Sequence, residues 1–128
     1  MFNRKDKNTI DSLIGISTNI EGNVHFKGGL RIDGHVKGNV IAESGSSSML
    51  VISEKAKIDG EVRAAHIVVN GEINGPVFCS DLIELQTKAR ISGDVHYKAL
   101  EMMNGALVAG NLTHDQAAEP VLKLAASN

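Results

Sequence analysis

The sequence predicts an all-β fold, a β-solenoid of about six rungs, because one five-residue unit recurs along the chain at a nearly regular spacing. The unit is aliphatic-x-Gly-x-aliphatic, and its glycines are Gly22, Gly38, Gly60, Gly75, Gly93 and Gly110. A second column, made of aliphatic pairs, follows the same period. The composition agrees, since Gly contributes 13 of 128 residues while aromatic residues make up 3% and Trp is absent. Such a composition favours a core of repeated Ile and Val layers.

Successive glycines of the unit lie 16, 22, 15, 18 and 17 residues apart. The long step contains the small polar stretch ESGSSS at Glu43–Ser48, which predicts a loop insertion of about five residues. Without it, the period is about 16 to 17 residues. The similar stretches KAKIDGEV at Lys55–Val62 and KARISGDV at Lys88–Val95 therefore occupy the same corner two rungs apart.

The second column confirms this period and predicts the type of element. Its aliphatic pairs are Leu30/Ile32, Leu50/Ile52, Ile67/Val69, Ile83/Leu85 and Leu100/Met102. Alternation of apolar and polar residues, as in Ile32 to Val40, is typical of strands. The strands recur too closely to leave room for the helices of βαβ units. Short turns should instead coil the chain, with roughly three short faces per rung.

The two ends of the predicted coil lack an obvious cap. Nothing before Ile20 or after Leu112 resembles a capping helix, and an uncovered terminal rung offers its backbone to another copy. We therefore expect end-to-end stacking, with a polymer interface made of Ile20, Val24, Leu107, Val108 and Leu112. The alternative is a monomer whose tails fold over the ends.

The expected organisation has three parts. Residues 1–18 form a flexible N-terminal segment, 19–113 the β-helix polymerisation domain, and 114–128 a flexible C-terminal tail. The start, MFNRKDK, combines an apolar tip with a small basic cluster, which is typical of a weak foot on an anionic membrane surface. The membrane-binding candidates are Met1, Phe2, Arg4, Lys5 and Lys7. The alternative is that these residues form an ordinary solvent-exposed N-terminus with no role at a membrane.

We expect no catalytic residue, cofactor or metal. The five histidines lack metal-ligand spacing, and His25, His35 and His96 fall at outward positions of the alternation. The single Cys79 has no base nearby in sequence, excludes an internal disulfide, and suits a reducing cytoplasm. No phosphate-binding loop is present, and the net charge of −2 offers no basic footprint for nucleic acid. No apolar run reaches the length of a membrane span, so the sequence predicts a soluble, intracellular protein.

The chain resembles the bactofilins, bacterial polymer-forming cytoskeletal proteins, over roughly Ile20 to Leu112. The resemblance rests on RIDGHVKGNV, KIDGEV and VVNGEINGPV. It implies a single right-handed parallel β-helix with a triangular hydrophobic core and nucleotide-independent, non-polar filaments that assemble through both helix ends. It also implies a place on the inner face of the cytoplasmic membrane, with cell-wall enzymes or morphogenetic proteins as partners. One departure is that Val108 stands where family members often carry a Phe in the last rung.

Two other functions remain open at this level. Hexapeptide-repeat acyltransferases also build β-solenoids, with a catalytic His between subunits, but their regular six-residue repeat gives an 18-residue rung. The steps of this chain fit that repeat poorly, and the C-terminal helix and long substrate loop of that class are not visible. A monomeric adaptor scaffold is the third possibility.

Overall fold

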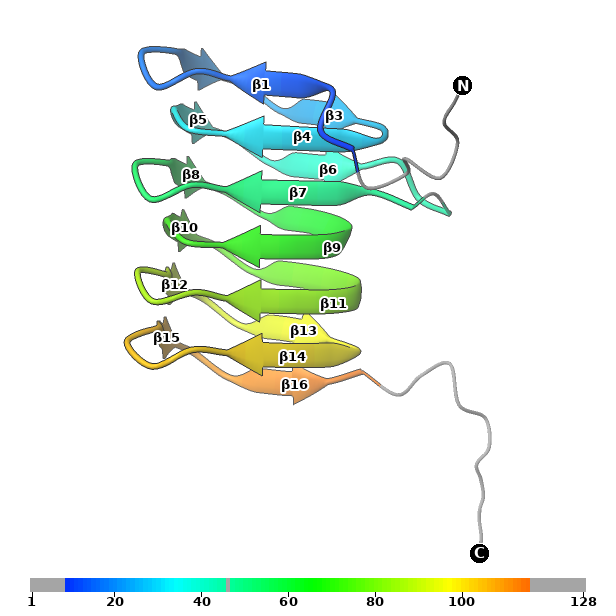
Figure 1. The fold of residues 1–128 in the computed structure, drawn as a ribbon, viewed down its shortest axis with the longest axis vertical. Helices are drawn as coiled ribbons and strands as arrows, with labels where there is room; N and C mark the ends of the chain where they lie inside the picture. The colour runs from blue at the N-terminus through cyan, green and yellow to red at the C-terminus, as the bar shows by residue number, and fades with distance from the viewer. Residues whose placement is uncertain (1–8, 46, 116–128) are drawn as a thin grey trace, which may run out of the picture.

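The computed structural model describes residues 9–45 and 47–115, which form sixteen short β-strands and no helix. The chain descends through stacked rungs from one end of the molecule to the other (Figure 1). The strands nearest the viewer run to the left, and the chain returns to the right behind them as it descends. The coil is therefore a right-handed parallel β-helix, as the resemblance implied.

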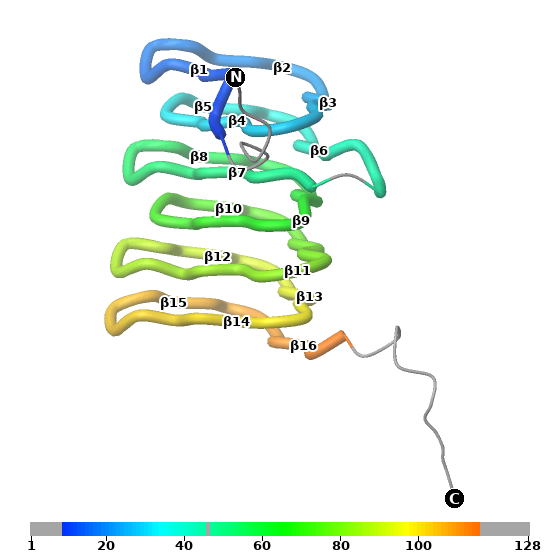
Figure 2. Tube along the Cα trace, turned by 45° about the vertical axis from the view of Figure 1, so that its right-hand side comes forward, coloured from blue at the N-terminus to red at the C-terminus, as the bar shows by residue number. Residues whose placement is uncertain are grey.

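Each rung contributes one strand, or part of one, to each of three faces, so the described residues make six rungs. Face 1 contains β1 (Ser12–Ile14), β4 (Gly29–Ile32), β7 (Met49–Ile52), the second halves of β9 (Val62–Val69) and β11 (Val77–Leu85), and β14 (Ala99–Met102). Face 2 contains β2 (Asn19–Glu21), β5 (His35–Lys37), β8 (Lys57–Asp59), β10 (Glu72–Asn74), β12 (Arg90–Ser92) and β15 (Leu107–Ala109). Face 3 contains β3 (Val24–Phe26), β6 (Val40–Ala42), the first halves of β9 and β11, β13 (Val95–Tyr97) and β16 (Leu112–His114). Figure 2 shows the narrow turns between faces 1 and 2 stacked along one edge.

The strands pair in parallel with the register that the sequence columns predicted. On face 1, Leu30 lies beside Leu50 and Leu50 beside Ile67. On face 2, the column runs from Ile20 through the inward Val and Ile residues to Val108. These inward columns form one aliphatic core, and most of their members are 0–3% exposed. Each aliphatic layer therefore packs on a similar layer above and below it.

The glycine column marks the corner between faces 2 and 3, where the backbone leaves no space for a side chain. Gly75 has φ +154°, and a Cβ atom there would lie 2.2 Å from the carbonyl oxygen of Gly60 in the preceding rung. The same close approach recurs at Gly93, where the distance to the Gly75 oxygen would be 2.5 Å. Only glycine meets both the backbone conformation and the contact. The recurring glycine is thus a requirement of stacking itself.

The solenoid begins earlier than the sequence indicated. Strand β1 pairs with β4 in register, although it lies within the segment 1–18 that we expected to be flexible and outside the repeat. The first position of this aliphatic column is Ser12 instead of Leu or Ile, so the column pattern fails at the first rung. At the other end, β16 continues to His114, one residue beyond the expected boundary at 113.

The predicted insertion lies between β6 and β7, where the chain leaves the regular path of the rungs. Ser48 closes this loop against the body of the solenoid. Its side chain is buried, and its Oγ accepts a hydrogen bond of 2.8 Å from the backbone N–H of Ala65. The loop thus enlarges one rung without disturbing the register of its neighbours.

Polar side chains at the outward positions connect neighbouring rungs. His35 Nε2 lies 3.0 Å from Asp59 Oδ2, and the side-chain amide of Asn74 donates to Asp59 Oδ1 at 2.8 Å. These hydrogen bonds, Asn74 first and His35 second, lower the pKa of Asp59. His66 and Glu84 make a similar link at 2.7 Å. The outward histidines and carboxylates therefore tie rungs together on the surface.

Cys79 is an inward residue of face 3, in line with Ala64 of the rung before. The side chain is 4% exposed, and the thiol donates to the carbonyl oxygen of Ala65 at 3.1 Å. Burial raises the pKa of Cys79 to about 11. The group is therefore a protonated thiol at neutral pH, which suits a small core residue and not a nucleophile.

Replacing Gly75 by Ala should destabilise the solenoid, because the new Cβ would meet the Gly60 carbonyl oxygen. Gly22→Ala is the matched control, since Gly22 heads the same column with φ +131° and nothing within 4 Å of the added Cβ. In the unassembled molecule, the control retains only the backbone strain, about 1–3 kcal/mol. Thermal melts followed by the β circular-dichroism signal should show a lower midpoint for Gly75→Ala than for Gly22→Ala. Equal midpoints would show that the close contact carries no cost.

The Cys79 thiol should resist aromatic disulfide reagents at pH 8 in the native protein and react fully once the chain is unfolded in guanidinium. Burial and the raised pKa both suppress the reactive thiolate. The release of the coloured thiol product measures the reaction. Rapid native labelling at a rate near that of a free thiol would contradict the buried position.

Candidate polymer interface

The first rung, β1 to β3, has strand partners on one side only. These strands pair with β4, β5 and β6 respectively, and no other described strand pairs with them. Ile20, Val24 and Phe26 are half-buried here, whereas Val36 and Val40, the next members of the Ile20 and Val24 columns, are fully buried. The upper end of the core is thus partly open within the described chain.

The last rung is open in the same way. Strands β14, β15 and β16 pair with β11, β12 and β13, and among the described residues no strand continues beyond them (Figure 1). Parallel strands present a row of backbone N–H and C=O groups along such an edge. A further rung of the same kind could pair with that row.

Exposure along the aliphatic columns measures how open this end is. Leu85 is 1% exposed, and Met102, the next member of its column, is 45% exposed. Val95 is 0% exposed, and Leu112 below it is 42% exposed. The positions are equivalent within the coil, so the difference comes from the missing rung. The last rung therefore displays apolar core positions that the other rungs cover.

The structure places the predicted interface residues at the two ends, as terminal members of their columns or beside them. Ile20 and Val24 belong to the first rung; Val108 and Leu112 belong to the last and extend inward columns. Leu107 differs, because it follows the outward column that contains Arg90. It is 58% exposed at the rim of the last rung, outside the core.

Sequence reasoning missed several apolar residues at the ends. The sequence places Met102 in the column of aliphatic pairs, but the predicted interface does not include it. Met102 is the last member of that column, so the column itself was the signal that it lies at the end of the solenoid. Met103 and Ile16 lie outside the columns, and they are 56% and 64% exposed. Ile16 lies between β1 and β2, next to the strand that the repeat pattern did not detect. The open ends are therefore more apolar than predicted.

Charge is sparse at both ends. The only Asp, Glu, Lys or Arg residue from β1 to β3 is Glu21, and the only one from β14 to β16 is Glu101. The middle rungs, in contrast, carry ion pairs such as Arg31–Asp33 and Arg63–Glu61. Two ends of this kind can approach with little electrostatic repulsion and little loss of hydration.

The membrane candidates Met1, Phe2, Arg4, Lys5 and Lys7 lie outside the described residues. Within the described ranges there is no helix long and apolar enough to cross a bilayer. The same part of the chain holds no cluster of His, Cys, Asp or Glu that could bind a metal ion.

Comparison with known proteins identifies the family to which this repeat belongs. The family model described as "Bactofilin: Polymer-forming cytoskeletal" matches residues 12–113, close to the span from β1 to β16. The chain is also 25% identical over 114 residues to Bactofilin BacO of Myxococcus xanthus (strain DK1622), covering 89% of this chain and 87% of that protein. No solved structure was found to match. Because the family model spans most of the chain, this protein belongs to the bactofilins, a family of polymer-forming cytoskeletal proteins with a structural role.

Proposed function

We propose that copies of this chain stack end to end through their terminal rungs and form a filament without a nucleotide. One observation carries the proposal: core positions that are 0–1% exposed in inner rungs become 42–45% exposed in the last rung. A stacked copy would cover these positions and pair with the open backbone edge. Covering the exposed halves of Met102 and Leu112 would contribute about 1 kcal/mol each.

Because both ends of the solenoid are open, a filament is a better model of the assembly than a closed dimer. A contact at one end joins two molecules, whereas contacts at both ends propagate without limit. Both terminal rungs are open within the described chain, and both are poor in charge. The C-terminal rung exposes more of its inward columns, since Ile14 at the other end is only 9% exposed. The contact at the C-terminal rung should therefore contribute more to assembly.

We further propose that the filament lies on the inner face of the cytoplasmic membrane and helps to position cell-wall or cell-shape machinery. The apolar and basic residues of 1–7 support the membrane contact. A single segment of this composition binds a membrane weakly, but many such segments on one filament bind tightly through avidity. The cell-wall partners rest on the resemblance to the family.

An arginine at Val108 should abolish polymers, because it would place an unpaired charge at the apolar end of the core. Met102→Arg tests the same end at a residue that is already 45% exposed, where folding tolerates the change. Ser92→Arg, outward on the adjacent strand β12, is the control that adds the same charge away from the end. Sedimentation and electron microscopy without nucleotide should show filaments for Ser92→Arg only. Normal filaments from both Val108→Arg and Met102→Arg, with the β signal intact, would exclude the C-terminal rung as the contact.

Deletion of residues 1–7 should release the filaments from anionic vesicles without dissolving them. The deletion removes the apolar tip and the basic cluster but leaves every described strand in place. Co-sedimentation with vesicles containing phosphatidylglycerol measures binding, and pelleting without lipid measures assembly. Lipid binding equal to that of the full chain would refute the membrane foot while leaving the filament proposal standing.

A further inference from the structure

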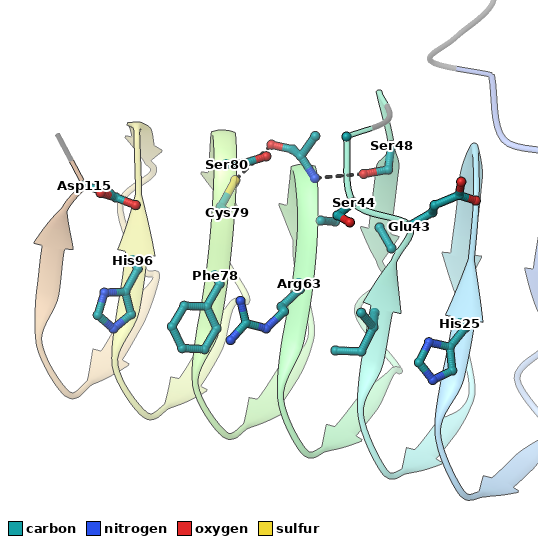
Figure 3. Close-up of a pocket in the computed structure, with 15 residues that line it drawn as sticks. His25, Glu43, Ser44, Ser48, Arg63, Phe78, Cys79, Ser80, His96 and Asp115 are labelled. Atoms are coloured by element: carbon teal, nitrogen blue, oxygen red, sulfur yellow. Dashed lines mark hydrogen bonds between the residues drawn. The ribbon is translucent and has the colours of Figure 1, made fainter. Parts of the chain in front are cut away.

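A groove of about 620 Å³ runs along the outer side of face 3. Its base is a column of outward side chains, one from each of five successive rungs. They are His25, Ile41, Arg63, Phe78 and His96. Figure 3 shows His25, Arg63, Phe78 and His96 in a row across the strands, with the loop after β6 forming one wall. The groove therefore crosses most of the solenoid parallel to its axis.

The groove combines apolar surface with flat, weakly hydrated groups. The rings of Phe78 and His96 stack with centroids 4.8 Å apart, and the Arg63 guanidinium carbon lies 4.0 Å from the centre of the Phe78 ring. Ala65 adds a small side chain to the lining of the groove. Arg63 also pairs with Glu61, so its charge is largely balanced. A surface of this kind favours an extended segment with aliphatic side chains.

The chain itself leaves the solenoid at this groove. β16 is the last strand of face 3 and lies beside β13, which carries His96. Asp115, which directly follows β16, lines the groove, and Figure 3 shows it above His96, to one side of the row of rings. Whatever follows Asp115 therefore starts at the mouth of the groove.

We propose that residues 116–128 of the same chain dock in this groove and cross the rungs of face 3. The segment, QAAEPVLKLAASN, contains Val121, Leu122 and Leu124, and its only charges are those of Glu119 and Lys123. Fully extended, it would reach about 40 Å, whereas five rung spacings measure about 24 Å. The length is thus sufficient to reach from the last rung to the first.

The N-terminal segment fits this groove less well. Residues 1–8 include Arg4, Lys5, Asp6 and Lys7, and the chain that follows them enters beside Gly28 and Gly29. Neither glycine lines the groove. The C-terminal segment is the better candidate for this groove, because it starts beside the groove and carries fewer charged residues.

Docking on face 3 would act as a clamp across rungs and would leave both ends of the solenoid free. It is therefore independent of end-to-end stacking, and either proposal can fail without the other. The segment would cover the stacked rings of Phe78 and His96.

A tryptophan at position 78 reports occupancy of the groove, because the chain has no other Trp. In the full chain carrying Phe78→Trp, the double change Leu122→Ser/Leu124→Ser should raise the acrylamide quenching constant about twofold and shift the emission to longer wavelength. Lys123→Ser, between the two leucines, is the matched control and should change neither. Adding a synthetic peptide of residues 116–128 to the double variant should restore the shielding.

The substitution at Phe78 could itself weaken binding of the segment. The same quenching measurement is therefore repeated with a second reporter, Ile41→Trp, which leaves Phe78 in place. If Leu122→Ser/Leu124→Ser leaves quenching unchanged at both reporters, the groove is not the site of this segment. If the shielding disappears on dilution, the segment comes from a neighbouring copy, and docking within one chain is overturned. Concentration-independent shielding that depends on the two leucines supports the proposal.

Discussion

A rung of this solenoid can satisfy its backbone and bury its aliphatic side chains only against another rung. Parallel strands such as β8, β10 and β12 take their hydrogen bonds from the rungs above and below, and Ile58, Ile73 and Ile91 pack on one another in the same direction. No helix or second sheet covers the core in the described chain. Stability therefore rises with each neighbour that a rung gains, and the terminal rungs have one neighbour too few.

The close stacking of the rungs explains the recurring glycines, and it also motivates the proposed end-to-end assembly. A Cβ atom at Gly75 or Gly93 would come within 2.5 Å of the carbonyl oxygen in the rung before, so each corner must stay bare for the rungs to meet. The same uniformity makes the last rung resemble an inner rung that has lost its partner. Its exposed Met102 and Leu112 occupy core positions, which is why we propose another copy as the partner of this surface. The proposed stacking requires only a matching edge on another copy.

Much of the fold follows from the sequence because each inward column repeats. The glycine steps and the aliphatic pairs predicted the number of rungs, the strand positions and the insertion at Glu43–Ser48. Strand β1 of the first rung escaped detection because Ser12 replaces the expected aliphatic residue, and a single serine can occupy a position that has only one neighbouring layer. The outward position of Leu107 could not be predicted either, because it depends on the register of β15 with β12. The groove on face 3 could not be predicted, since it depends on the path of the inserted loop and on rings that stack only once the rungs are in register.

Fibre diffraction from oriented filaments tests the central claim most directly. If the terminal rungs stack as the inner rungs do, the spacing of about 4.8 Å between strands should lie along the filament axis and continue across each junction between molecules. The meridional reflection should then be sharp, with no second strand spacing. A reflection on the equator would show that the solenoid axis lies across the filament, and that the open ends are not the contacts that build it.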